Sequence, residues 1–269
     1  MIPKFNLHTH TSLCDGKNTV EEMVLSAIEL GCDGIGFSGH STIETSLDWT
    51  MSLSREQQYI KEVNALKEKY CDKIEILLGI EYDVLSDIDT SPYDYVIGSV
   101  HHSVVGNVPI DLAADDLKRY VDELFGGDFY ALAEDYYGSL SGVVEKTGCD
   151  IVAHFDLVTK FNEGGELFDQ SNKRYRDAAF GCLEALLRKD VIFEINTGAI
   201  SRGYRKSPYP SKEILTRMAE LRAKITVTTD CHSAGSILCA YDDAIALARE
   251  CGVRELYFPR NKIFVPYKI

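Results

Sequence analysis

Short apolar runs alternate with longer segments of helical periodicity along the whole chain, and this alternation restricts the possible folds more than any other feature. Each apolar run has the length of one strand, and each helical segment is long enough to cross back over a sheet, which is the pattern of a parallel α/β fold. The expected strands are residues 4–10, 33–40, 73–81, 93–101, 150–155, 191–196, 224–230 and, as an eighth candidate, 255–259.

The segments between these strands carry helix signals. Residues 19–31 open with Thr19 and Glu22 in a capping box and end at Gly31, and a second helix is expected to open with Ser54 and Gln57 as its capping pair. Further helices are expected near 114–125, 129–147, 173–189, 211–222 and 241–251. There is no internal repeat and no linker, so we expect one domain over residues 1–269. Seven or eight βα units in one domain predict a barrel, regular or distorted.

Composition narrows the class of protein. A chain of 269 residues with 45% hydrophobic residues can bury a large core, yet no apolar run approaches the roughly 18 residues that cross a bilayer. The start of the chain lacks the layout of a signal peptide, so we expect a soluble, cytoplasmic protein with no membrane partner. The eight cysteines form no CxxC pair and are expected to be reduced. A net charge of −14 argues against a nucleic-acid partner and favours a small substrate, while the choice between monomer and homo-oligomer stays open.

The histidines lie at equivalent places in the predicted fold. His8 and His10 end the first expected strand, His40 the second, His101 and His102 the fourth and His154 the fifth, and His232 follows the seventh. Glu81 ends the third expected strand and Asp230 the seventh. In a parallel barrel the carboxyl ends of all strands converge on one face, so these side chains are expected to meet in one pocket.

Side-chain alternation selects the residues that face this pocket. Residues two apart on a strand share a face, so His8 and His10 point the same way. After the fourth strand His102 shares a face with the apolar Val96 and Val100, so we expect His101 to face the pocket and His102 to lie behind it or to contact the substrate.

A single histidine at a strand end is commonly a hydrogen-bonded structural residue, and either acid alone fits a helix cap or an ion pair. That explanation does not account for the position that nearly all the histidines share. Each lies at the same end of a strand, with a partner acid. Imidazole and carboxylate together suit zinc, manganese or iron, and this many groups can hold two or more ions.

The motifs HTHTSLCDG, FSGHS, GIEYD, GSVHH, AHFDL and TDCHS occur in this order and resemble the PHP (polymerase and histidinol phosphatase) family of metal-dependent phosphoesterases. The resemblance implies a distorted (β/α)7 barrel with three divalent transition metal ions at the carboxyl ends of the strands. It implies the following ligands: His8, His10, Glu81 and Asp230 for one ion, the bridging Glu81 with His101 and His154 for a second, and Asp15, His40 and His232 for the third. In some relatives the position of Asp15 is a histidine.

Within this family, the segment EINTGAISRGYRKSPYPS (194–211) resembles the histidinol-phosphate phosphatase branch. By that resemblance Arg202 binds the substrate phosphate, and a guanidinium is suited to this because it donates two parallel hydrogen bonds. Lys160, six residues after His154, is expected to make a second phosphate contact. The alternative for both is a solvated loop cation.

The expected reaction is therefore hydrolysis of L-histidinol phosphate to L-histidinol and phosphate, in histidine biosynthesis, by a hydroxide that bridges two metals. Arg202 and the metals are expected to stabilise the developing charge, and Asp230 or His232 to supply or relay the proton to the leaving oxygen. Asp156, Glu163 and Glu194 are candidates for binding the amine and imidazole of the substrate. The alternatives are a PHP enzyme for another small phosphate ester, nucleotide or cyclic phosphate, a PHP nuclease, and a non-catalytic metal-binding protein.

Overall fold

A computed structural model describes residues 2–43 and 48–269 of the chain. Its strands are β1 Phe5–Asn6, β2 Gly34–Phe37, β3 Glu75–Asp83, β4 Tyr95–Ser99, β5 Ile151–Val152, β6 Ile192–Asn196, β7 Lys224–Thr228, β8 Glu255–Arg260 and β9 Ile263–Lys268. Its α-helices are α1 Val20–Glu29, α2 Leu53–Lys69, α3 Ala114–Phe125, α4 Phe129–Ser141, α5 Val143–Thr147, α6 Lys173–Leu186, α7 Gly198–Ser201, α8 Lys212–Glu220 and α9 Tyr241–Glu250. Three short 3-10 helices are η1 Val105–Asn107, η2 Leu157–Thr159 and η3 Ala234–Ser236.

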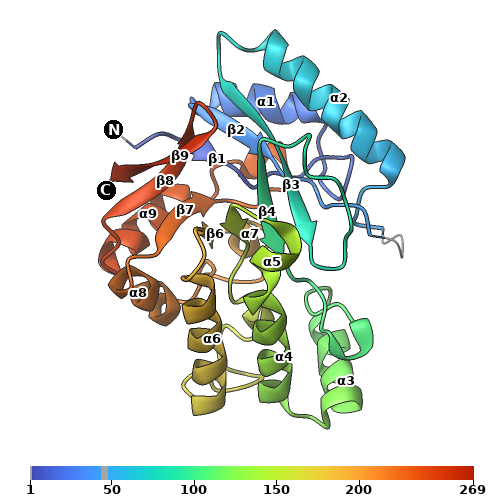
Figure 1. Ribbon diagram of the computed structural model, residues 1–269, viewed down its shortest axis with the longest axis vertical. Coiled ribbons are helices and arrows are strands. Elements are labelled where there is room, and N and C mark those ends of the chain that lie inside the picture. Colours follow the sequence, from blue (N-terminus) through green and yellow to red (C-terminus); the bar gives the residue numbers. More distant parts are fainter. Residues whose placement is uncertain (1, 44–47) are drawn as a thin grey trace.

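The seven strands β1 to β7 form one parallel sheet in the order in which they occur along the chain (Figure 1). The sheet curls until its first and last strands meet. Beyond the ends of β1 and β7, Thr9 pairs with Cys231 in parallel, and the backbone N–H of Cys231 donates to the oxygen of His8 at 3.1 Å. The predicted (β/α)7 barrel is confirmed, and its closing contacts lie between residues of the predicted metal site.

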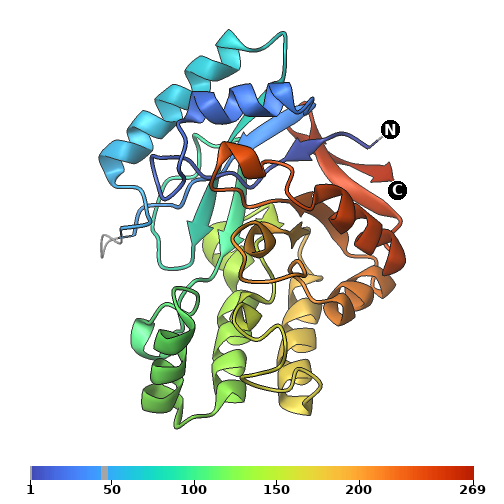
Figure 2. The same cartoon turned by 180° about the vertical axis from the view of Figure 1, so that it is seen from behind.

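Two of the groups of helices around this barrel lie at opposite ends of the molecule. Helices α1 and α2 lie beside each other over β2 and β3, whereas α3, α4 and α6 extend together at the other end of the molecule (Figures 1 and 2). The predicted helix 129–147 is divided at Gly142 into α4 and α5. None of the described helices is both long and apolar enough to cross a membrane.

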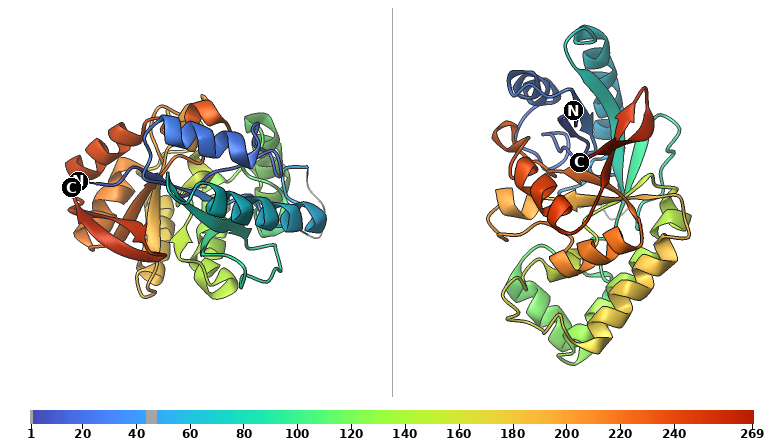
Figure 3. Two further views of the ribbon diagram at one scale, coloured as in Figure 1. Left: turned by 90° about the horizontal axis from the view of Figure 1, so that it is seen from above. Right: turned by 90° about the vertical axis from the view of Figure 1, so that its left-hand side faces the viewer.

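One local expectation was wrong, and the eighth expected strand is present but lies outside the barrel. The capping box of Thr19 and Glu22 is present, but α2 begins at Leu53 with Ser52 as its N-cap, so Ser54 and Gln57 do not cap it. The Ser52 hydroxyl accepts from the N–H of Arg55 at 3.3 Å, two residues earlier than expected, and Ser52 offers the same capping chemistry as Ser54. The candidate eighth strand is β8, which pairs antiparallel with β9 in a separate hairpin near both termini (Figure 3).

A buried tyrosine joins three strands inside the barrel. The Tyr95 ring lies against Gly36 and Gly79, and its hydroxyl donates to the backbone oxygens of Leu7 and Phe37. A Cβ at Gly36 would lie 2.4 Å from the Tyr95 hydroxyl, and one at Gly79 would lie 2.3 Å from its ring. These two positions therefore require glycine, and the strands that carry His40 and Glu81 are fixed relative to the first strand.

Candidate metal centre

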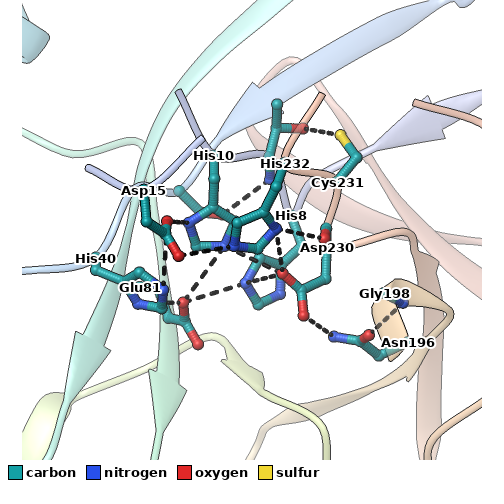
Figure 4. Close-up of polar contacts among 12 residues, drawn as sticks. His8, His10, Asp15, His40, Glu81, Asn196, Gly198, Asp230, Cys231 and His232 are labelled. Atoms are coloured by element: carbon teal, nitrogen blue, oxygen red, sulfur yellow. Dashed lines mark hydrogen bonds and ion pairs between the residues drawn. The ribbon is translucent and has the colours of Figure 1, made fainter. Parts of the chain in front are cut away.

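All nine predicted metal ligands converge at the carboxyl ends of the barrel strands. Figure 4 shows those other than His101 and His154. Three groups of side chains have donor atoms within 4.8 Å of one another: His10, Asp15, His40 and His232; His8, His10 and Asp230; and His40, Glu81 and His101. His154 joins them through its Nε2, which lies 3.1 Å from Glu81 Oε1.

Glu81 lies between two pairs of histidines. Its Oε2 is 3.3 Å from His8 Nε2 and 3.6 Å from His10 Nε2. Its Oε1 is 3.3 Å from His101 Nε2 and 3.1 Å from His154 Nε2. Because each oxygen faces a different pair, the carboxylate has the arrangement of a ligand that bridges two ions.

The two other acids complete the cluster on the side away from His101. Asp230 Oδ1 lies 3.2 Å from His10 Nε2, and Asp15 Oδ2 lies 3.1 Å from His232 Nε2. Asp15 Oδ1 lies 3.8 Å from His40 Nε2, so Asp15 reaches the two histidines with which it was grouped. Asp15, which follows the first strand, thus lies with His40 and His232, whereas His8 lies with Asp230, and His10 belongs to both groups.

His40 occupies an intermediate position. Its Nε2 faces Asp15, whereas its Nδ1 lies 2.8 Å from Glu81 Oε2. The imidazole therefore contacts both the predicted third cluster and the bridging carboxylate.

The donor atoms fit metal ions in a further respect. His8 Nε2, His10 Nε2, His40 Nδ1 and Glu81 Oε2 are buried and form no hydrogen bond within residues 2–43 and 48–269. A buried polar atom without a hydrogen bond costs about 1–3 kcal/mol, so four on one small cluster need a compensating partner. Divalent cations accept lone pairs from nitrogen and oxygen donors of this kind, and the residues present fit such ions.

A second layer of carboxylates orients these imidazoles. His8 Nδ1 lies 3.0 Å from Glu194 Oε2, and His101 Nδ1 lies 2.8 Å from Asp83 Oδ2. Glu194 also accepts hydrogen bonds from Thr228 Oγ1 and Asn196 Nδ2. With Nδ1 engaged behind the site, each ring presents Nε2 to the centre, which is the usual support for a histidine that binds a metal.

The local backbone directs Asp230 into the cluster. Asp230 adopts φ 45°, a left-handed conformation that is uncommon for an aspartate at a strand end. Its side chain packs on Gly198, where a Cβ would lie 2.7 Å from the carboxylate, and Asn196 Nδ2 donates to Oδ2 at 3.3 Å (Figure 4). The segment after β6 thus leaves space for this acid.

Opposing charges perturb the protonation of the cluster. Burial alone would raise the pKa of Glu81, but His40, His8 and His101 hold that pKa well below its usual range. Burial alone would lower the pKa of His8, yet Glu194, Asp230 and Glu81 raise it well above normal. Without metal, protons on imidazole therefore balance the buried carboxylates.

His10 behaves differently from His8. Burial and the neighbouring His232 and His40 lower the pKa of His10 to about 3, so this ring stays neutral. The Arg202 guanidinium and the nearby imidazoles hold the pKa of Asp230 well below normal against the effect of burial. Both groups are thus in the protonation state in which they bind metals.

The cluster forms the floor of a cavity of about 540 Å³. Besides seven of the nine predicted ligands, its lining comprises Lys17, Trp49, Asp111, Leu112, Leu157, Lys160, Ser201, Arg202, Tyr204, Ser233 and Ser236. Arg202 Nη2 lies 3.1 Å from Asp230 Oδ2, and Nη1 lies 3.3 Å from His232 Nε2. Both predicted phosphate-binding cations therefore line the cavity, and Arg202 lies beside two of the predicted ligands.

His102 is not among the described residues that line the cavity. Its ring is buried and stacks on Trp49 at 6.0 Å between centroids. Trp49 in turn lies edge-on to His40 at 4.7 Å. His102 thus supports an aromatic wall of the cavity, and Trp49, the only tryptophan, carries no motif by which the sequence could have revealed it.

The three acids proposed for substrate contact do not line the cavity. Glu194 is buried behind His8, and the carboxylate of Asp156 accepts from the N–H of Ser211 at 2.8 Å. Glu163 accepts from the backbone of residues 206 and 207. The expectation that these acids contact the substrate was wrong. The side chain of a residue near a strand end in the sequence can point behind the site or form hydrogen bonds that hold a loop in place. Among the described residues, the acid outside the predicted ligand set that lines the cavity is Asp111.

A parallel β/α barrel with a buried cluster of histidines and acids at the carboxyl ends of its strands defines a class of metal-dependent barrel protein. The family model described as "PHP domain" matches residues 5–198, and the chain belongs to this family.

Relatives and solved structures agree with this. The chain is 27% identical over 270 residues to a "Probable histidinol-phosphatase" of Deinococcus radiodurans, covering 95% of this chain and 96% of the relative. It is also 27% identical to the "Histidinol-phosphatase" of Bacillus subtilis, covering 87% and 96%. The crystal structure of histidinol phosphate phosphatase from Lactococcus lactis, complexed with zinc, L-histidinol and phosphate, matches with a TM-score of 0.74 at 24% identity, covering 98% of this chain and 99% of that one. That structural match supports the same fold.

Proposed function

We propose that this protein is a phosphomonoesterase that hydrolyses L-histidinol phosphate to L-histidinol and phosphate. The observation that carries the proposal is Glu81, whose two oxygens face different histidine pairs on the floor of a cavity that also exposes Arg202. The names of the relatives in Deinococcus and Bacillus support the choice of substrate.

The proposed ligand sets are those implied by the family resemblance, with three divalent ions held by His8, His10, Asp15, His40, Glu81, His101, His154, Asp230 and His232. Zinc is the first ion to test, because the Lactococcus structure contains it. When bound, such ions activate water and neutralise phosphate oxygens. Arg202 then contributes two parallel hydrogen-bond donors to the phosphate, next to Asp230.

The leaving alcohol needs a proton. The pKa of Asp230 is held well below normal, so this carboxylate is ionised. It is therefore suited to bind metal and not to donate a proton. His232 lines the cavity beside Arg202 and, of the two candidates, is the one left to relay the proton, through the ring nitrogen that does not bind metal. We keep the expectation of a cytoplasmic enzyme.

The test is a steady-state assay of metal-loaded protein on L-histidinol phosphate, other small phosphate monoesters, a nucleoside monophosphate, a cyclic nucleotide and single-stranded DNA. The expected result is that kcat/KM is highest for L-histidinol phosphate and that DNA is not hydrolysed. Glu81→Gln serves as the inactive control. A higher kcat/KM on another ester would contradict the assigned substrate while leaving the phosphoesterase site intact.

A further inference from the structure

The cavity is lined by acids that can contact a substrate. Four acids line it: Asp15, Glu81, Asp111 and Asp230. Three of them belong to the metal-ligand groups, and Asp111 does not. Among the described residues, Asp111 is therefore the cavity carboxylate that remains available to a ligand once metals are bound.

The chain holds Asp111 in a fixed position. After β4 it folds back on itself, so that His102 pairs antiparallel with Pro109 and the N–H of Ile110 donates to the oxygen of His101 at 3.0 Å. The Ile110 side chain is buried and anchors this return. Asp111 thus directly follows Ile110, whose backbone is hydrogen-bonded to the proposed metal ligand His101.

Lys160 secures the other side of Asp111. Its ammonium donates to the backbone oxygen of Asp111 at 2.5 Å and lies 3.4 Å from Oδ2, and it sits 4.6 Å from the centre of the Tyr204 ring. No hydrogen bond to Asp111 Oδ1 is present within the described part of the chain. One carboxylate oxygen is thus held, and the other is free to accept.

Charge supports the same conclusion. Burial alone would raise the pKa of Asp111, but Lys160, His101, His154 and Arg202 together lower it, so the carboxylate stays ionised in the cavity. Lys160 offsets part of this negative charge at Oδ2, and the free Oδ1 can accept a charge-assisted hydrogen bond from a cation of the substrate. L-Histidinol phosphate carries such a cation, an ammonium separated from the ester oxygen by two carbon atoms.

We propose that Asp111 is a specificity residue that binds the ammonium group of an amino-alcohol phosphate, with Lys160 holding it in place. This inference rests on the proposed function and adds the recognition of the amine. It assigns Lys160 to positioning Asp111, in place of the direct phosphate contact expected from the sequence.

The experiment compares two esters: L-histidinol phosphate and its deaminated analogue, which keeps the imidazole and the phosphate. Asp111→Asn keeps the shape and removes the charge, and Asp115→Asn, at an exposed position of α3, is the matched control. Losing a charge-assisted hydrogen bond should lower kcat/KM for the amine-bearing ester roughly 10- to 100-fold. The kcat/KM for the deaminated analogue should change by no more than about twofold, as expected for a surface substitution.

A second measurement does not depend on turnover. Calorimetric titration with L-histidinol should show weaker binding to Asp111→Asn than to wild type, and no difference for the deaminated alcohol. If Asp111→Asn lost kcat/KM equally on both esters, or on neither ester, this inference would be overturned and the proposed function would stand. Wild-type turnover of the analogue without turnover of L-histidinol phosphate would overturn the proposed function and this inference together.

Discussion

Replacement of Arg202 by alanine tests the anion-binding part of the site. In the structure Nη2 lies 3.1 Å from Asp230 Oδ2 and Nη1 lies 3.3 Å from His232 Nε2, with the side chain 29% exposed to the cavity. Burial would lower the pKa of Arg202, but Asp230 and other nearby acids raise it, so the guanidinium stays charged. A phosphate placed on the ligand cluster lies within reach of both terminal nitrogens.

The magnitude follows from these contacts. Two charge-assisted hydrogen bonds contribute about 1.5–3 kcal/mol each. Part of this is offset, because Arg202 already pairs with Asp230 before substrate binds. We therefore expect a net loss of about 3–4 kcal/mol, which is roughly a 100- to 1,000-fold fall in kcat/KM.

The assay is steady-state release of phosphate from L-histidinol phosphate, with the metal content of each variant measured in parallel. Arg202→Lys keeps the charge but loses the paired donors, so it should lie between wild type and Arg202→Ala. Arg174→Ala, on the exposed ion pairs of α6, is the matched control and should change kcat/KM by no more than about twofold. If Arg202→Ala behaved like Arg174→Ala at full metal content, the reasoning would be refuted.

Three further outcomes are expected. Glu81→Gln should lower metal content as well as activity, because a neutral amide bridges two ions poorly, and retention of all metal by elemental analysis would contradict the bridging role. Asp83→Asn should weaken metal binding roughly 10- to 100-fold by releasing His101 Nδ1, and calorimetric metal titration of the stripped protein measures this. Because nearby carboxylates raise the pKa values of His8 and His101, protons compete with metal as the pH falls. Metal affinity should therefore decrease from pH 8 to pH 6 in a chelator-competition assay, and a constant affinity would count against these ligands.

The sequence predicted the barrel and its cluster well because both follow from periodicity. Strand alternation distinguished His101 from His102, and the structure places His101 against Glu81 and His102 behind Trp49. The cap of α2 was not predictable in this way, since Ser52 and Ser54 offer the same hydroxyl two residues apart and periodicity does not distinguish them.

Contacts made by loops were not predictable in this way. Asp111 lies in PIDLAADD, where three aspartates look equivalent, and only the pairing of residues 102 and 109 directs one of them into the cavity. Glu194 lies near the carboxyl end of its strand, as Glu81 does. Its side chain nevertheless lies behind His8, because Thr228 and Asn196 hold it there. Sequence position indicates the end of the barrel but not the depth of a side chain.

The contact between Thr9 and Cys231 that closes the barrel also sets the time at which the site can form during synthesis. Asn6 and Cys231, which lie on the two sides of this closure, are separated by 225 residues. At a translation rate of about 5–20 residues per second, the ribosome needs roughly 10–45 s to make the chain between them. During that interval His8 and His10 have left the ribosome without Asp230 or His232, so a nascent chain holds only part of each ligand set. Complete metal capture is thereby postponed until translation is nearly over.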